Sequence, residues 1–315
     1  MPVDAQLQPL LDLLNAAPRL ELGPDSATEF REQFLAMNPF LGEGPEVDVA
    51  QGAAPGPAGP IPLRIYRPLG TAGTVLPGVV FFHGGGFVIG SIESHDRDCR
   101  ILCAEAGVAV VSVEYRLAPE HPFPAAPDDC LAALRWVSAN GASLGIDTDR
   151  LAVAGDSAGG NLAAVTALGW AAAGGSPLRL QALIYPVTDL TPTIEEPRYD
   201  SMLENAEGYY LDLTTMLWFE QCYLPDKSLA LEPTCSPQLA PDLGGLPDSL
   251  VITCQFDPLR DQGEAYAKRL SDAGVAATLS RYDGGIHGIF SMSCIADIGR
   301  RCMDEVVAAV RSSVH

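Results

Sequence analysis

The chain has 315 residues, of which 47% are hydrophobic and 19% charged, and its formal net charge is −21. This composition is typical of a globular protein, and the length suffices for one large α/β domain or a domain with an insert. The negative charge argues against binding to nucleic acid or to an anionic membrane surface, because both require positive patches. No apolar run reaches the roughly 20 residues of a membrane-spanning helix.

The N-terminal segment predicts two amphipathic helices. Apolar side chains recur there at helical spacing, first at Leu7, Leu10, Leu11 and Leu14 and then at Phe30 and Phe34. The opening residues lack the basic start of a secretory signal and carry Asp4 and Asp12, so we expect a cytoplasmic protein. The eight cysteines form no Cys-x-x-Cys pair and are interpreted as reduced, mostly buried thiols.

The rest of the chain alternates between strand-like and helix-like segments. A Gly/Pro/Ala-rich turn region, Gln51–Pro62, is predicted between short β-like runs at Val47–Val49 and Leu63–Tyr66. The strands predicted beyond it are Gly78–Phe82, Ala109–Val113, Leu151–Ala154, Leu180–Tyr185, Leu250–Cys254 and Ala277–Tyr282. The predicted helices are Ser94–Ala106, Ala126–Asn140, Ala158–Ala173, Leu213–Tyr223, Gln262–Ala273 and Ala296–Ser312. Apolar strands alternating with helices indicate a parallel sheet covered on both faces.

One stretch interrupts this alternation. From about Thr188 to Pro237 the chain is acidic and contains prolines, with one helix and no convincing strand. So long a break usually marks an insertion, often a lid over a site.

One serine is flanked by small residues at the predicted junction between a strand and a helix. The sequence Gly155-Asp156-Ser157-Ala158-Gly159 follows the apolar run Leu151–Ala154 and precedes an alanine-rich helix. Gly-x-Ser-x-Gly in this context fits a nucleophile elbow, whose sharp turn leaves no space for bulky neighbours of the serine. A plain connection or a phosphate cradle would also use glycines, so the motif alone is only suggestive.

Three further motifs strengthen the interpretation. His83-Gly84-Gly85-Gly86 follows an apolar strand, and its glycines free backbone N–H groups to point at an oxyanion. Asp257 ends a strand and His287 follows the last one, which gives the order serine, acid, histidine.

Together these motifs resemble the hormone-sensitive-lipase-like α/β-hydrolases, and the bacterial family IV carboxylesterases in particular. The resemblance is carried by His83–Gly86, "YRLAPEHPFPAA" (115–126), "GDSAGGNLA" (155–163), "DPLRD" (257–261) and "IHG" (286–288). It covers roughly Ile61 to the C-terminus.

The resemblance implies an α/β-hydrolase fold: a mostly parallel eight-stranded sheet with helices on both faces and a helical cap. Residues 1–45 would form part of the cap, 46–187 the first part of the core, 188–237 the cap insertion and 238–315 the second part of the core. It also implies a catalytic triad and an oxyanion hole, formed by Ser157, Asp257 and His287 and by the N–H groups of Gly85, Gly86 and Ala158.

Two other carboxylates compete for the role of the acid. Asp261 enters a helix, where a carboxylate acts as a cap, and Asp283 precedes two glycines, where a turn role explains it. Asp257 is preferred because a strand end would hold it rigidly. The family commonly has Phe after His-Gly, and Ile289 at this position is expected to alter packing or the shape of the acyl pocket.

The remaining notable side chains are interpreted as structural. We expect His83 to brace the glycine loop, Asp156 to be a hydrogen-bond partner, and His95 and His121 to be surface or loop residues. Tyr115-Arg116 and Glu120-His121 would fix a buried loop. Trp218 and Phe219 either line the acyl pocket or form the packing face of a helix. No metal-binding motif is present, and no metal or other cofactor is expected.

These features predict a serine carboxylesterase that acts on small-molecule esters with short- to medium-chain acyl groups. A serine amidase, peptidase or acyltransferase would use the same triad, and the sequence does not separate these activities. A non-catalytic small-molecule receptor on this fold is disfavoured, because such a protein is expected to lose the histidine that His287 supplies. A homo-oligomer is compatible with the sequence.

Overall fold

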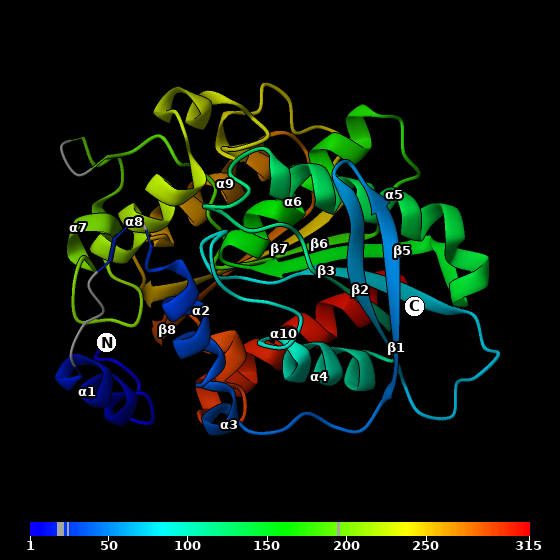
Figure 1. The fold of residues 1–315 in the computed structure, drawn as a ribbon, viewed down its shortest axis with the longest axis horizontal. Coiled ribbons are helices and arrows are strands. Elements are labelled where there is room, and N and C mark those ends of the chain that lie inside the picture. Colours follow the sequence, from blue (N-terminus) through cyan, green and yellow to red (C-terminus); the bar gives the residue numbers. More distant parts are fainter. Residues whose placement is uncertain (18–21, 24, 194–195) are drawn as a thin grey trace.

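The computed structural model describes residues 1–17, 22, 23, 25–193 and 196–315 (Figure 1). In these residues eight strands form one sheet in the order β1-β2-β4-β3-β5-β6-β7-β8. Their bounds are β1 Asp48–Gly56, β2 Gly59–Arg67, β3 Leu76–Phe82, β4 Ala109–Val113, β5 Ile146–Asp156, β6 Leu180–Ile184, β7 Asp248–Phe256 and β8 Ala277–Ile286. Strand β2 is antiparallel to both its neighbours, and all pairs from β4 to β8 are parallel. The predicted mostly parallel eight-stranded sheet is confirmed.

Helices cover both faces of the sheet (Figure 1). One face packs against α5 (Ala125–Leu144), α6 (Ala158–Ala172) and α9 (Arg260–Asp272), and the other against α4 (Asp96–Ala106) and α10 (Asp297–Val314). Alternate side chains of a strand point to opposite faces. In β3, Val80 and Phe82 therefore join the first of these cores, and Val79 and Phe81 join the second. Burial on both faces explains why these strands read as continuous apolar runs.

The prediction of a turn region at Gln51–Pro62 is wrong. Strands β1 and β2 run through it as a hairpin, paired from Asp48↔Arg67 to Gly56↔Gly59. The prolines are tolerated because Pro55 lies on the edge strand β1 and because Pro60 and Pro62 lie in the part of β2 that extends beyond its pairing with β4, where a strand can do without some of its N–H donors. Buried Ala54 and Ile61 give this hairpin an inward face despite its composition.

The interpretation of Asp283 as a turn residue is also wrong, because Asp283 lies on strand β8. The strand continues to Ile286, so Asp283 is an exposed strand residue rather than a turn residue. The pairing register shifts between Cys254 and Phe256 of β7, and Gly284 opposite has a φ of +80°. Because of this irregularity, β8 continues through Gly284 and Gly285, and His287 follows directly after its last residue.

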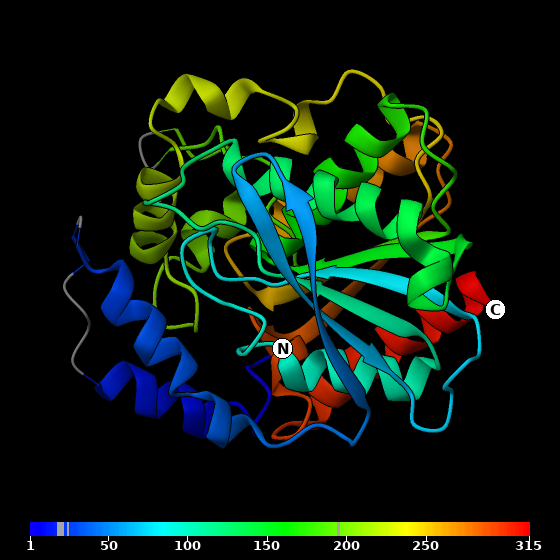
Figure 2. The ribbon, with the colours of Figure 1, turned by 45° about the vertical axis from the view of Figure 1, so that its right-hand side comes forward.

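The N-terminal helices and the insertion lie on the same side of the molecule (Figures 1 and 2). The first group comprises α1 (Gln8–Ala16), α2 (Ala27–Leu35) and the short α3 (Asn38–Leu41). The second comprises α7 (Asp200–Glu204), α8 (Leu213–Tyr223) and the 3₁₀ turns η1 (Lys227–Leu231) and η2 (Pro237–Leu239); a third such turn, η3 (Ile289–Met292), follows His287. The helices of the described part of the chain are all too short or too polar to cross a membrane.

Candidate active site

Ser157 occupies a strained turn between β5 and α6. Its φ is +56° and its ψ −118°, a conformation that side chains other than glycine rarely adopt. The glycines on either side permit the turn, because a Cβ on Gly155 would lie 2.3 Å from the carbonyl oxygen of Gly159 and one on Gly159 2.0 Å from that of Phe82. The Ser157 N–H donates to the Ile184 carbonyl at 2.8 Å, which fixes the turn against β6.

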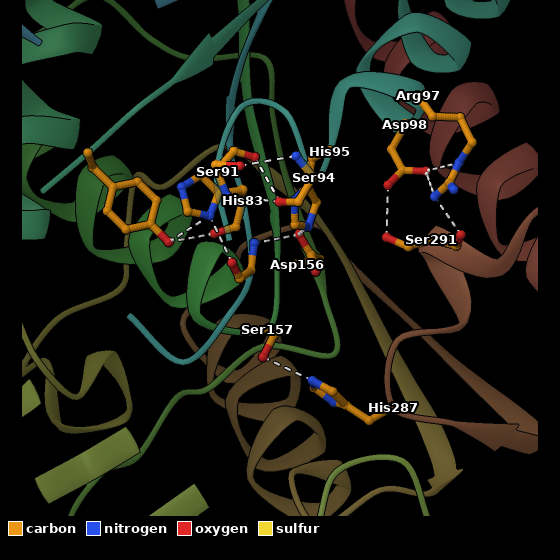
Figure 3. A network of polar contacts seen from close by, with 12 residues as sticks. His83, Ser91, Ser94, His95, Arg97, Asp98, Asp156, Ser157, His287 and Ser291 are labelled. Atoms are coloured by element: carbon orange, nitrogen blue, oxygen red, sulfur yellow. Dashed lines mark hydrogen bonds and ion pairs between the residues drawn. The ribbon is translucent and has the colours of Figure 1, made fainter. Parts of the chain in front are cut away.

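Ser157, His287 and Asp257 form a continuous hydrogen-bonded chain. The Ser157 Oγ lies 2.9 Å from His287 Nε2 (Figure 3), and His287 Nδ1 lies 2.8 Å from Asp257 Oδ2. The other carboxylate oxygen of Asp257 accepts the Leu259 N–H at 2.8 Å. An ionised Asp257 only accepts, so Nδ1 carries the imidazole proton and Nε2 is free to accept the serine proton. Asp257 is fully buried, and both partners are nearly so.

The glycine loop after β3 borders the serine. Gly85 and Gly86 have φ values of +116° and +58°, which only glycine adopts without strain. Within the described part of the chain, the N–H groups of Gly85, Gly86 and Ala158 have no hydrogen-bond acceptor. These donors are therefore available to a bound oxygen atom. Gly86 also touches the insertion, since a Cβ on it would lie 2.2 Å from the ring of Phe219.

A buried polar network lies beneath this loop (Figure 3). Asp156 Oδ1 accepts the Gly84 N–H at 2.8 Å and lies 3.2 Å from His95 Nε2. His83 Nδ1 is 2.8 Å from the Gly84 carbonyl oxygen, and the Tyr115 hydroxyl donates to the His83 carbonyl at 2.7 Å. Asp156 and His83 thus make the structural contacts expected of them.

Of the two alternatives for His95, surface or loop, the surface position is wrong: His95 lies in the turn that precedes α4. Its side chain is buried, with 2% of the residue exposed. The sequence does contain a signal for this: His95 precedes Cys99, Leu102 and Ala106 at helical spacing, and these three are buried on one face of α4. His121, by contrast, is exposed as expected.

The serine opens into a cavity of about 380 Å³. Its walls come from the N-terminal helices (Phe30, Phe34, Met37), from the insertion (Met216, Phe219) and from the loops that carry Gly85, Gly86 and His287. Trp218 points elsewhere, and its indole N–H donates to the Gly23 carbonyl at 2.9 Å. Ile289 is fully buried in the core under the sheet and is not among the described residues that line the cavity. It therefore alters packing rather than the shape of the pocket.

Asp261 makes different contacts from those expected. It lies in the first turn of α9, but its Oδ2 accepts the N–H of Ser201 at 2.8 Å and its Oδ1 the Arg260 guanidinium at 2.7 Å. Asp261 therefore holds α7 of the insertion rather than capping its own helix, and it makes no contact with His287. Across the described residues, no group of three or more His, Cys, Asp or Glu side chains is arranged to hold a metal ion.

Comparisons with known proteins agree with this geometry. Residues 79–291 match the family model described as alpha/beta hydrolase fold. Esterase LipI of Mycobacterium tuberculosis is 38% identical over 97% of this chain and 94% of its own length. Ethyl acetate hydrolase of Pseudomonas putida is 41% identical over 80% of this chain and 78% of its own. A hyperthermophilic esterase from the archaeon Pyrobaculum calidifontis, 44% identical, superposes with a TM-score of 0.92 over 99% of both chains.

The fold and these relatives place the chain in the α/β-hydrolase class. Within that class, it belongs to the hormone-sensitive-lipase-like family.

Proposed function

We propose that Ser157 is the nucleophile through which this carboxylic ester hydrolase cleaves esters of short- to medium-chain acids. Its relatives are named as esterases and carboxylesterases, and ester hydrolysis is the activity of this protein too. The observation that carries the proposal is the chain of hydrogen bonds from Ser157 through His287 to Asp257 at the end of a largely apolar cavity.

The chemistry follows from the positions of the protons. His287 Nε2 takes the proton of Ser157 as Oγ attacks the ester carbonyl, and Asp257 orients the imidazole and stabilises its positive form. The same imidazolium then protonates the leaving alcohol as the C–O bond breaks, leaving an acyl-enzyme. Water, deprotonated by His287, then attacks the acyl group. As the acid leaves, the imidazolium of His287 returns the proton to Ser157.

The oxyanion of each tetrahedral intermediate would be bound by the N–H groups of Gly85, Gly86 and Ala158. Their free donors support this role. Ala158 also begins α6, a 15-residue helix, so the positive end of the helix dipole faces the developing charge.

We further propose that residues 1–45 and 188–237 form a cap that limits the acyl chain. Each methylene of the acyl chain that is buried against walls from α1, α2 and α8 would improve the binding free energy by about 0.8 kcal/mol, until the chain reaches the end of the cavity. Activity should be highest for acyl chains of about four to eight carbons. The cytoplasmic location is part of the same proposal and is supported by eight free cysteines, six of them buried.

The test is a hydrolysis profile over p-nitrophenyl esters of increasing acyl length, with labelling by a serine-directed phosphonate. We expect a maximum at medium length, a single labelled residue at Ser157, and a loss in kcat on the order of 10⁶-fold in Ser157→Ala. Activity that rises steadily to palmitoyl esters would contradict the limit set by the cap. A label on another serine would contradict the nucleophile.

A further inference from the structure

His95 and Asp156 form a second histidine–aspartate couple, which lies near Ser157 and His287 of the proposed triad (Figure 3). Asp156 is adjacent to Ser157 in the chain, and its carboxylate takes the N–H of Gly84, which directly precedes Gly85 and Gly86. The approach is so close that a Cβ on Gly84 would lie 2.4 Å from Asp156 Oδ2. The proposed mechanism uses neither His95 nor Asp156.

The contacts around His95 favour a ring that is protonated on both nitrogens. The Ser94 hydroxyl has one proton, which it donates to the Ser91 carbonyl at 2.9 Å. Its oxygen accepts the Ser91 N–H at 2.8 Å and, with the hydroxyl proton in that position, also accepts from a protonated His95 Nδ1, which lies 2.8 Å away. His95 Nε2 faces Asp156 Oδ1, which already accepts from Gly84. With the Ser94 proton directed at the Ser91 carbonyl, both ring nitrogens act as donors, and this arrangement favours an imidazolium at His95.

The surrounding charges favour the same state. Asp156 at the end of β5, Asp98 on α4 and Glu114 after β4 face His95 with negative charge, and Arg97 on α4 opposes them. Burial alone would lower the pKa of His95, but Asp156 outweighs it and the pKa is raised above its ordinary value. Burial lowers the pKa of His83, whose ring centre is 5.6 Å away, to about 3, so this neighbour is neutral.

We propose that the buried imidazolium–carboxylate pair of His95 and Asp156 positions the glycine loop, so that oxyanion stabilisation depends on the charge of His95. The pair acts through Gly84: the carboxylate holds its N–H, and the neutral His83 ring holds its carbonyl oxygen. Both residues are positioning residues, and their role rests on the ester hydrolysis proposed above.

Loss of the His95 charge should disturb the loop in two ways. Without the Nδ1 proton, the Ser94 hydroxyl must turn from the Ser91 carbonyl to the ring, which breaks a bond of the turn leading into α4. Asp156 would also become a buried, uncompensated carboxylate. Because the folded pKa is raised, the pair is complete at and below the ordinary pKa of histidine and is lost as the pH rises through the folded value. The expected signature is a fall in kcat at alkaline pH.

The test compares wild type with His95→Gln, His95→Phe and, as a matched control, exposed His121→Gln. Glutamine keeps a donor in place of Nε2 but cannot carry the charge, and phenylalanine removes both donors. With p-nitrophenyl butyrate, kcat and KM are measured from about pH 6 to pH 10, and the protonation of the His95 ring is read from its ¹⁵N shifts at pH 7.

We expect wild type and His121→Gln to share an alkaline fall in kcat that His95→Gln lacks. At pH 7, His95→Phe should lower kcat by about 10²-fold, as for a misplaced oxyanion donor, with KM changed less than about threefold. Nitrogen shifts of a neutral ring, or an alkaline fall retained in His95→Gln, would overturn the proposal even if His95→Phe did not fold. A wild type that hydrolysed no ester would refute the proposed function instead, and the ring shifts would still report on the pair.

Discussion

The two walls of the cavity are built in different ways. On the sheet side, Ser157, Asp257 and His287 lie at strand ends, where backbone hydrogen bonds and close approaches of glycine leave no freedom. On the side of the proposed cap, α2 and α8 present apolar side chains; Arg31 of α2 donates to Val88 of the core, and Trp218 of α8 donates to Gly23 of the N-terminal segment. From this difference we predict that the sheet side fixes the chemistry and that the proposed cap tunes the substrate preference. Changes to the first should lower kcat, and changes to the second should raise KM.

The stronger of these two contacts is that of Arg31 on α2. Its guanidinium donates to the carbonyls of Val88 and Ala118 at 2.7 and 2.9 Å and to both carboxylate oxygens of Glu120. Val88 lies in the loop that follows the glycines, so Arg31 joins α2 to the loop that is proposed to bind the oxyanion. The two walls therefore meet at one loop.

The largest effect is expected for Asp257→Asn. Asparagine can still accept the Leu259 N–H, but its NH₂ group would face His287 Nδ1 and favour the wrong tautomer of the imidazole. We expect kcat to fall by up to about 10⁴-fold with little change in KM or melting temperature. Steady-state kinetics and melting curves check this. Asp283→Asn, on an exposed position of β8, is the control and should retain full kcat.

Gly86→Ala tests the loop where the two walls touch. A side chain there would strain a φ of +58° and collide with the ring of Phe219, so we expect kcat to fall by about 10²–10³-fold. The double variant Gly86→Ala/Phe219→Ala removes the collision and leaves the strained loop. Recovery of wild-type kcat in the double variant would show that the cap contact, and not the direction of the N–H groups, is responsible.

The sequence predicted residues of the sheet side of the cavity better than the contacts of the proposed cap. Ser157 could be predicted as the nucleophile because a sharp turn demands glycines at Gly155 and Gly159, and such a demand is visible in one sequence. Asp257 and His287 were predicted from their places at strand ends and their order in the chain. The contacts of the cap left no such trace. Arg31 is an ordinary charged residue on a helix until the fold brings Val88 and Ala118 beside it. The burial of His95 could have been predicted from its spacing to the buried face of α4, but its pairing with Asp156 could not, because that partner lies on another element.

Arg31→Met should raise KM several-fold while kcat changes less than about threefold, because it loosens α2 and leaves the strand ends intact. Glu120→Gln is the matched control: it removes the ion pair but keeps the Arg31 bonds to the two carbonyls, so a smaller effect is expected. Arg31 lowers the pKa of Glu120 to about 2. The pair is therefore complete above the ordinary pKa of a glutamate and is lost as the pH falls through the folded pKa of about 2. The KM difference between Arg31→Met and wild type should stay constant between about pH 6 and pH 9.

The smallest effect is expected for Asp261→Asn, which also decides between the two carboxylates of the "DPLRD" motif. Asp261 touches the cap rather than the imidazole: it accepts the N–H of Ser201 in α7 and pairs with Arg260. Burial would raise the pKa of Asp261, but Arg260 and the Ser201 N–H outweigh it and the pKa is lowered. Its contribution should therefore be present at neutral pH and be lost as the pH falls through the folded pKa.

An amide at this position keeps one acceptor oxygen, so only part of these contacts is lost. We expect Asp261→Asn to lower the free energy of unfolding by about 1 kcal/mol, as for a lost helix cap, and the melting temperature by about 2–4 °C. The destabilisation relative to wild type should shrink at acidic pH, where Asp261 is protonated in both states. Because α7 borders the cavity through Met202, a modest rise in KM is also expected, with kcat unchanged. If Asp261→Asn lost its kcat while Asp257→Asn remained active, the catalytic acid would be Asp261. Asp257 would then have the structural role that is predicted here for Asp261.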